Sequence, residues 1–188
     1  MPKHEKTRAD AWALLTEFTT NQSLIKHSLC VESAMRHYAA YFKEDPETWG
    51  MVGLLHDFDY EKYPSLADHP YKGQEILEDH GWSSEIRQGI MAHAPHTETA
   101  RITRMQQTIF AVDELAGFIV AVALVRPNKK LATVEVKSIK KKLKAKGFAA
   151  AVNREDITQG AAELGLSLDE HIQHVLTALQ AIATDIEL

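Results

Sequence analysis

Helix-start and helix-stop signals recur along this chain, and they constrain its fold more than any other feature. Asp45-Pro46-Glu47 combines an N-cap residue, a proline suited to the first helical position and an acid in the first turn. Ser167-Leu168-Asp169-Glu170 has the spacing of a capping box. Gly81, Gly147 and Gly165 stand where helices would need to end. Together these signals predict an all-α chain.

Apolar residues recur at helical spacing in two long segments. In residues 24–42, one stripe carries His27, Val31, Met35, Tyr38 and Phe42. In residues 103–125, one stripe carries Gln106, Phe110, Asp113, Gly117 and Val120. Ser83 is placed to start a further helix that stops before Pro95. Convincing strand-like alternation is confined to residues 131–136, which is too short to found a sheet.

Length and composition favour a single globular domain. The chain has 188 residues, of which 45% are apolar, and this excludes a disordered chain. Its one cysteine, Cys30, excludes an internal disulfide and a cysteine-rich zinc site. Residues 1–6 lack the apolar run of a signal peptide, and the longest apolar window, 115–125, is about half of a membrane span. We therefore expect a cytoplasmic protein without a membrane partner.

The charge is distributed unevenly along the chain. The formal net charge is −5, which argues against general nucleic-acid binding. Residues 126–146 nevertheless carry nine basic side chains and one acid, which gives +8 there and −13 elsewhere. This basic segment either attracts phosphate groups or forms the solvated face of a helix whose apolar side is Val136, Ile139 and Leu143.

Histidines and aspartates occupy positions that are usually apolar or that close a helix. His27 and Asp113 lie on the two apolar stripes, where a polar side chain is unfavourable unless it is paired or bound to metal. His56-Asp57 closes an apolar run, His69 precedes an expected helix, and His93 ends another. Six imidazole or carboxylate side chains therefore come from five different segments.

Mixed histidine and aspartate ligands suit Fe, Mn, Co, Ni or Zn. A carboxylate can bridge two ions, and Asp57 is the natural candidate because histidines flank it along the chain. Two ions about 3.5–4 Å apart would hold a phosphoryl oxygen and activate a shared water. Each histidine also has a structural interpretation, as a core residue bonded to a backbone carbonyl. The histidines interpreted as surface or helix-end residues are His4, His37, His80, His171 and His174.

The pattern resembles the HD-domain superfamily of metal-dependent phosphohydrolases, whose H…HD…D motif is matched by His27, His56-Asp57 and Asp113. His69 and His93 resemble the additional ligands of HDIG-type members with six ligands and two metals, a branch that includes the bacterial HD-type diadenosine tetraphosphate hydrolase. Family members with two metals often continue Ile-Gly-Lys or Ile-Ala-Lys after the HD pair. Here the first lysine after that pair is Lys62, which stands two positions later than the lysine of the family motif.

The resemblance implies a helical bundle with a metal-binding core at about 23–125 and a helical C-terminal extension at about 126–188. It implies one or two divalent ions (Fe, Mn, Co, Ni, Zn or Mg). The first would be held by His27, His56, Asp57 and Asp113, and the second by Asp57, His69 and His93. The expected reaction is hydrolysis of a small phosphorylated metabolite, most simply a nucleotide, by metal-activated water.

Other residues are candidates for further roles. Asp57 and Asp59 would be catalytic, with Asp59 as an outer base or as the residue that orients a histidine, unless it is an exposed loop acid. Lys62, His96 and Arg126 are candidates for phosphate contact. His96 has no counterpart in the family and is alternatively a proton donor to a leaving oxygen or an exposed loop histidine. Two alternatives stay open: an HD-type di-iron oxygenase with the same ligands, and a non-catalytic protein that senses a nucleotide. The sequence leaves the oligomeric state undecided.

Overall fold

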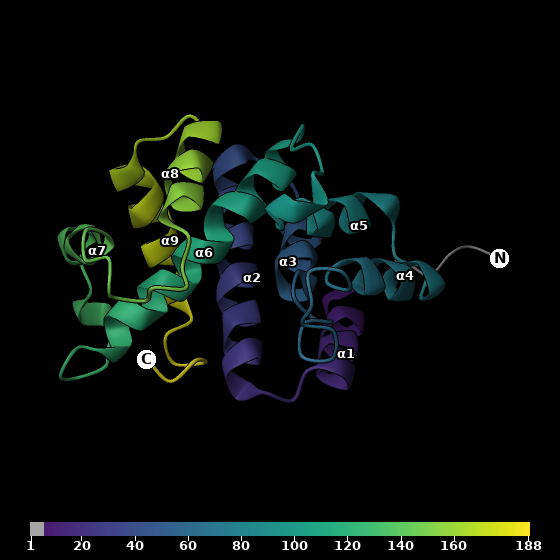
Figure 1. Cartoon of the computed structure of the whole chain (residues 1–188), viewed down its shortest axis with the longest axis horizontal. Helices are drawn as coiled ribbons and strands as arrows, with labels where there is room; N and C mark the ends of the chain where they lie inside the picture. Colours follow the sequence, from purple (N-terminus) through teal and green to yellow (C-terminus); the bar gives the residue numbers. More distant parts are fainter. Residues whose placement is uncertain (1–5) are drawn as a thin grey trace.

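The computed structural model describes residues 6–188, and all regular structure in that range is helical (Figure 1). The helices are α1 (Arg8–Phe18), α2 (Gln22–Phe42), α3 (Pro46–Leu55), α4 (Tyr71–Asp79), α5 (Ser84–Met91), α6 (Arg104–Leu124), α7 (Val136–Leu143), α8 (Arg154–Glu163) and α9 (Leu168–Ala181). Two 3₁₀ turns, η1 (Pro95–Thr97) and η2 (Leu131–Thr133), lie between them. Residues 6–188 contain no strand, which confirms the all-α prediction.

Two expectations need comment. The alternating residues 131–136 form η2 and the start of α7 rather than a strand. His4 and most of the segment that argued against a signal peptide lie outside the described residues.

Side-chain caps begin the helices where the sequence predicts them. Asp45 accepts from the backbone N–H groups of Glu47 and Thr48, and Ser167 forms a complete capping box with Glu170. The C-terminal signals are correct at Gly81 and Gly165, whose φ angles of 75° and 73° suit glycine just after α4 and α8.

The stop signal at Gly147 is wrong. Helix α7 ends at Leu143, and Gly147 lies four residues further on without a positive φ. The chain turns here because Phe148 packs edge-on against Phe118 of α6, with ring centroids 5.4 Å apart. A tertiary contact, rather than a local glycine signal, sets the path of this segment.

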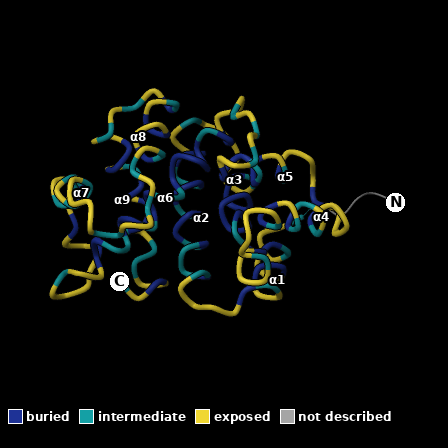
Figure 2. Tube along the Cα trace, viewed as in Figure 1, coloured by how far each residue is buried: buried dark blue, intermediate teal, exposed yellow. Residues whose placement is uncertain are grey.

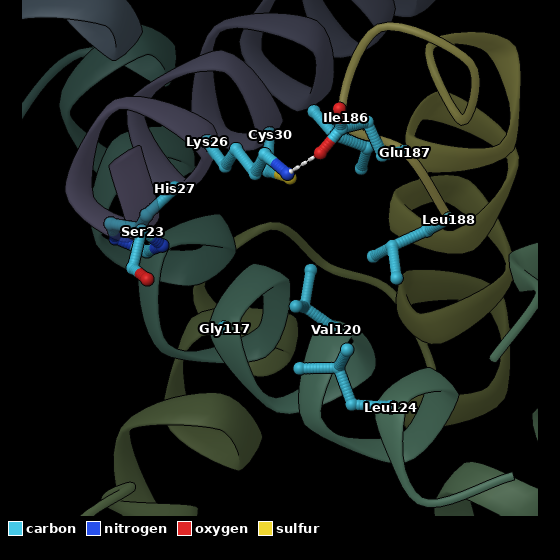
Figure 3. Close-up of a pocket in the computed structure, with 10 residues that line it drawn as sticks. All are labelled: Ser23, Lys26, His27, Cys30, Gly117, Val120, Leu124, Ile186, Glu187 and Leu188. Atoms are coloured by element: carbon cyan, nitrogen blue, oxygen red, sulfur yellow. Dashed lines mark hydrogen bonds and ion pairs between the residues drawn. The ribbon is translucent and has the colours of Figure 1, made fainter. Parts of the chain in front are cut away.

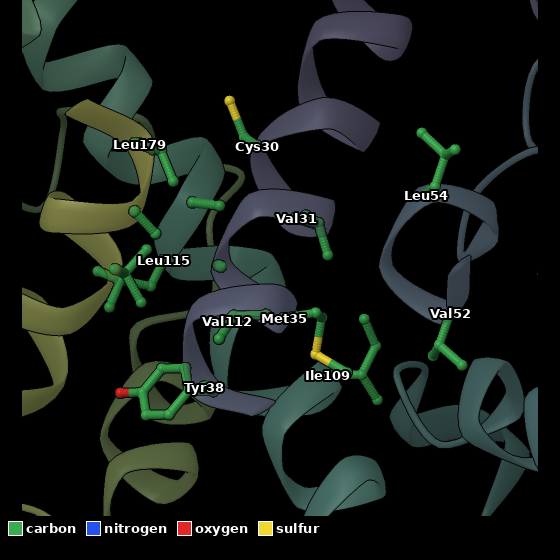
Figure 4. Packing of buried hydrophobic residues seen from close by; sticks show 14 of the residues in the cluster. Cys30, Val31, Met35, Tyr38, Val52, Leu54, Ile109, Val112, Leu115 and Leu179 are labelled. Atoms are coloured by element: carbon green, nitrogen blue, oxygen red, sulfur yellow. The ribbon is translucent and has the colours of Figure 1, made fainter. Parts of the chain in front are cut away.

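Helix α2 lies at the centre of the fold and packs against α3, α6 and α9 (Figure 1). Its inner face carries Val31, Met35 and Tyr38, which are fully buried among side chains of those three helices (Figure 4). Buried segments concentrate around α2, and the connecting loops are largely exposed (Figure 2). Burial of this apolar surface is the main force that holds the helices together.

The C-terminal helices share this core. Helices α7, α8 and α9 pack on α6, and α9 also contacts α2. Ile139, Ile157 and Ile172 are fully buried in the same apolar cluster as the residues of α2. In the basic segment, Lys137, Lys141 and Lys144 are exposed, while Ile139 points inward. This arrangement favours the solvated-face interpretation of the lysines.

Helix α6 passes through the middle of the domain. Within residues 6–188 it is the one helix long and apolar enough to cross a membrane, and 61% of its apolar stretch is buried inside the protein. The helices that pack against it are α2, α3, α5, α7, α8 and α9. Such burial is typical of a core helix in a globular domain, so α6 gives only weak support for a membrane span.

Candidate metal centre

The six histidines and aspartates that the sequence singles out come together where α2, α3 and α6 meet the segments after α3 and α5. They form two adjacent groups, within each of which the potential ligand atoms lie within 4.8 Å of one another. The first group is His27, His56 and Asp113, and the second is Asp57, His69 and His93. Each group could hold a metal ion.

Close packing of α3 on α2 brings the first histidines together. At Gly53, a Cβ atom would lie 2.8 Å from the carbonyl oxygen of Val31, so only glycine lets the two helices approach this closely. His56 follows at the end of α3, and its ring centroid lies 5.1 Å from that of His27 on α2. On α6, Asp113 reaches the same point, with Oδ1 2.9 Å from His27 Nε2.

Hydrogen bonds fix the protonation of three imidazole rings. The Nδ1 atom of His56 lies 2.7 Å from the Gly53 carbonyl oxygen, and that of His93 lies 2.6 Å from the Ile90 carbonyl oxygen. His69 Nδ1 lies 2.8 Å from Asp59 Oδ1. Because carbonyl and carboxylate oxygens only accept, each Nδ1 donates a proton. In the neutral rings, each Nε2 atom therefore has a free lone pair.

These Nε2 atoms lie close to carboxylate oxygens and to one another, all of which are also hydrogen-bond acceptors. His56 Nε2 is buried without a hydrogen-bond partner in the described part of the chain, 3.3 Å from Asp57 Oδ2 and 3.5 Å from Asp113 Oδ1. The Nε2 atoms of His69 and His93 are 3.2 Å apart, and each lies within 3.3 Å of Asp57 Oδ1. Only a cation can satisfy so many facing acceptors, so the residues fit a divalent metal site.

The charges of the cluster perturb the pKa values of its members. Burial by itself would lower the pKa of His56, but the carboxylates of Asp57 and Asp113 outweigh it and hold that pKa well above its usual value. Burial likewise opposes the effect of Asp57 and Asp59 on His69, whose pKa is raised to about 9. In the opposite direction, neighbouring imidazoles outweigh burial and lower the pKa of Asp57 and Asp113. The site thus favours positive charge, whether a proton or a metal ion.

Asp59 is 1% exposed, so the interpretation as an exposed loop acid is wrong. Besides the bond from His69, it accepts from the backbone N–H of Gly73 at 2.9 Å. A Cβ at Gly73 would lie 2.8 Å from Asp59 Oδ2, so the missing side chain makes this bond possible. With both oxygens engaged inside the protein, Asp59 is placed to orient His69 rather than to take a proton from water.

The three phosphate-contact candidates lie in different places. His96 is adjacent to the cluster and donates from Nε2 to the backbone oxygen of His69 at 2.9 Å. Lys62 instead contacts α1, where its Nζ donates to the Glu17 carbonyl and lies 3.8 Å from the centre of the Phe18 ring. Arg126 lies past the end of α6, which extends for eleven residues, or about 17 Å, beyond Asp113.

Sequence reasoning missed the partners that hold the imidazole rings. Two are the backbone carbonyls of Gly53 and Ile90. Every residue type offers such a carbonyl, so no side-chain signal could have revealed them. The glycine at 73 was a weak signal, because glycine is unfavourable inside a helix unless close packing requires it.

The histidines outside this centre were only partly interpreted correctly. His80 closes α4 as expected. The expectation of surface or helix-end positions is wrong for His171, which is fully buried between α2 and α6. His37 and His174 are partly buried and pair with each other at 2.9 Å between α2 and α9. We call His37, His171 and His174 the α9 histidine group.

Comparison with known proteins gives one match. The family model described as "HD domain" matches residues 24–117, which is half of the chain and spans all six clustered residues. No curated protein and no solved structure matches the chain significantly.

Proposed function

Since this chain belongs to the HD domain family, whose members are generally metal-dependent hydrolases, we propose that it is a metal-dependent phosphohydrolase. The substrate would be a small phosphorylated metabolite, most simply a nucleotide, with an ester or anhydride bond to phosphorus. One observation carries this proposal: the Nε2 lone pairs of His56, His69 and His93 face two carboxylates, and each Nδ1 proton is already held elsewhere. Such an arrangement suits divalent cations.

Asp57 would be shared by two ions. Its Oδ2 atom faces His56, and its Oδ1 atom faces His69 and His93. The first ion would be held by His27, His56, Asp57 and Asp113, and the second by Asp57, His69 and His93. When bound, divalent cations supply the positive charge that polarises a phosphoryl oxygen and activates water for attack on phosphorus.

The protein's own side chains control access to the cluster and the orientation of its imidazole rings. His56, His69 and His93 are buried on the inner side of the cluster, whereas the side chains of His27, Asp57 and Asp113 are 20–23% exposed. This open side gives water and phosphate access. Asp59 and the two backbone carbonyls keep the rings in place, so that the donor geometry is prepared before substrate arrives.

Elemental analysis of protein purified without chelator tests the proposal, together with a phosphate-release screen over nucleotides supplied with each candidate metal. We expect one or two tightly held ions per chain and metal-dependent phosphate release. Iron-dependent oxygen consumption without phosphate release would instead identify the di-iron oxygenase. A protein that holds no ion and releases no phosphate, yet binds nucleotide, would be the non-catalytic sensor.

A further inference from the structure

A cavity of about 380 Å³ lies between α2, α6 and residues 186–188, beside the metal centre (Figure 3). Its size is in the range of small-molecule sites. Most of its wall is apolar and is formed by Cys30, Gly117, Val120, Leu124, Ile186 and Leu188. The side chains of Val120, Leu124 and Leu188 point into it (Figure 3).

The cavity and the metal centre share a wall at His27. One edge of this ring presents Nε2 to Asp113 at 2.9 Å. A Cβ atom at Gly117 would lie 3.8 Å from both Cε1 and Nδ1, on the side of the ring next to Nε2. Gly117, one helical turn after Asp113, thus leaves the cavity open up to the histidine. A molecule with its phosphate at the cluster could extend directly into the cavity.

Residues 186–188 close the cavity on the side away from α6. The backbone folds back here, since Leu188 donates its N–H to the Ala183 carbonyl at 2.8 Å. Glu187 forms an ion pair with Lys26 of α2, which ties this segment to the cavity wall (Figure 3). These residues lie outside the stretch of the chain that matches the family model.

Building on the proposed function, we propose that this cavity binds the apolar organic group of the phosphorylated substrate. Apart from His27, its polar lining consists of Ser23 and the Lys26–Glu187 pair, which is too few groups for a sugar or a polyphosphate chain. The substrate class is therefore a phosphate ester or anhydride with a compact aromatic or aliphatic group. A nucleotide carries its sugar next to the phosphate, so this cavity fits a simple aryl or alkyl phosphate better than a nucleotide.

Binding of two phosphonates that differ only in their organic group tests the inference. We expect phenylphosphonate to bind the Mn²⁺-loaded protein at least about tenfold more tightly than methylphosphonate in calorimetric titrations, because the ring leaves water for an apolar wall. V120F fills the cavity and should remove this preference while changing methylphosphonate binding less than twofold. The matched control V125F, on the exposed residue just after α6, should leave both affinities unchanged.

A second variant and a second ligand test the cavity if V120F does not fold. If V120F unfolds, L124F supplies the same test from a half-exposed position. Equal binding of the two phosphonates, or an equal loss of both in the filled variants, would overturn the inference. Benzyl alcohol, followed by ligand-observed NMR in the metal-free protein, checks the cavity without phosphate or metal. It should bind the wild type and not V120F.

The outcomes separate the two proposals. If the wild type binds benzyl alcohol but releases no phosphate from phenyl phosphate or from any nucleotide, the cavity is an apolar binding site and the phosphohydrolase proposal fails. If phosphate is released at equal efficiency from phenyl phosphate and methyl phosphate, the phosphohydrolase proposal stands and the cavity inference fails.

Discussion

The molecule holds two groups of histidines that share helix α2 but differ in what faces their ring nitrogens. In the metal centre, His56 has a buried Nε2 that meets only carboxylates. In the α9 histidine group, His171 has both nitrogens satisfied: Nδ1 accepts from the Tyr38 hydroxyl at 2.6 Å, and Nε2 donates to the Ala111 carbonyl at 2.9 Å. Two equally buried imidazoles are thus suited to different tasks.

This difference in surroundings moves the pKa values of His56 and His171 in opposite directions. Carboxylates outweigh burial at His56 and hold its pKa well above the usual value. No carboxylate contacts His171 among the described residues, and burial lowers its pKa to about 4. Burial also lowers the pKa of His37 and His174. The metal centre is therefore built to receive positive charge, and the α9 histidine group to exclude it.

The largest expected effect is that of Asp57→Ala. This change removes the one carboxylate that faces both groups of the metal centre, so both ions should be lost. Losing the charge stabilisation of bound metal removes several kcal/mol from catalysis, a fall in phosphate release of about 1,000-fold or more. Elemental analysis and initial rates measure the effect.

The control for Asp57→Ala is Asp79→Ala, on the exposed last residue of α4. It should keep both metal content and rate. Circular dichroism should show native helix content in both variants. Full activity of Asp57→Ala would end the case for a metal mechanism at this site.

The sequence predicts the histidines of the metal centre but not the α9 histidine group, for a physical reason. His27 and Asp113 break apolar stripes within their own helices, and His56, His69 and His93 stand at the ends of segments. These are local features. The burial of His171 depends on Tyr38 and Ala111, which lie 133 and 60 residues away along the chain. The capping box at Ser167 sets where α9 begins but not which helix its first turn meets.

The same distinction explains the fold. Helix boundaries follow from caps such as Asp45, Thr103 and Ser167, whose partners lie within three residues. The fold of residues 144–153 and the closure of the cavity by residues 186–188 depend on contacts with α6 and α2. Non-local contacts of that kind leave no periodic pattern in a single sequence.

The next effect is on stability and concerns His171. Its pKa is about 6.5 in the unfolded chain and about 4 in the fold, so the unfolded chain binds the proton first on acidification. Its stabilising contribution is complete above pH 6.5 and is lost as the pH falls to 4. The loss is about 3 kcal/mol in the free energy of unfolding.

His171→Gln isolates this contribution. The amide can accept from Tyr38 and donate to the Ala111 carbonyl, but it does not titrate. Urea unfolding of the metal-free proteins at pH 7 and pH 4 should therefore show a smaller loss for the variant than for the wild type. Groups of the metal centre titrate alike in both proteins and cancel from the difference. Identical losses in the two proteins would contradict the buried, neutral state of His171.

Asp59→Asn is expected to act more weakly. The variant keeps a side chain of the same size but removes the charge that holds the Nδ1 proton of His69, so this imidazole becomes a poorer ligand. Loss of such a partner typically lowers metal affinity 10–100-fold. Competition with a chelator measures the affinity, and Asp79→Asn is the matched exposed control. An unchanged affinity would show that the bond between Asp59 and His69 serves packing only.

The smallest effect is expected for Lys62→Ala. This variant tests whether Lys62 binds the substrate phosphate, as the resemblance suggests, or stays bound to α1, as the structure shows. Lys62 is exposed, donates to the Glu17 carbonyl and lies over the Phe18 ring, so it is engaged with α1 rather than with the metal centre. Its removal should change metal content and the KM for substrate less than twofold, because none of the six clustered residues loses a partner. The control is Lys6→Ala, because Lys6 also lies over an aromatic ring, that of Trp82. A tenfold rise in KM for Lys62→Ala alone would mean that Lys62 leaves α1 to bind the substrate phosphate, as the lysine after the HD pair is expected to do.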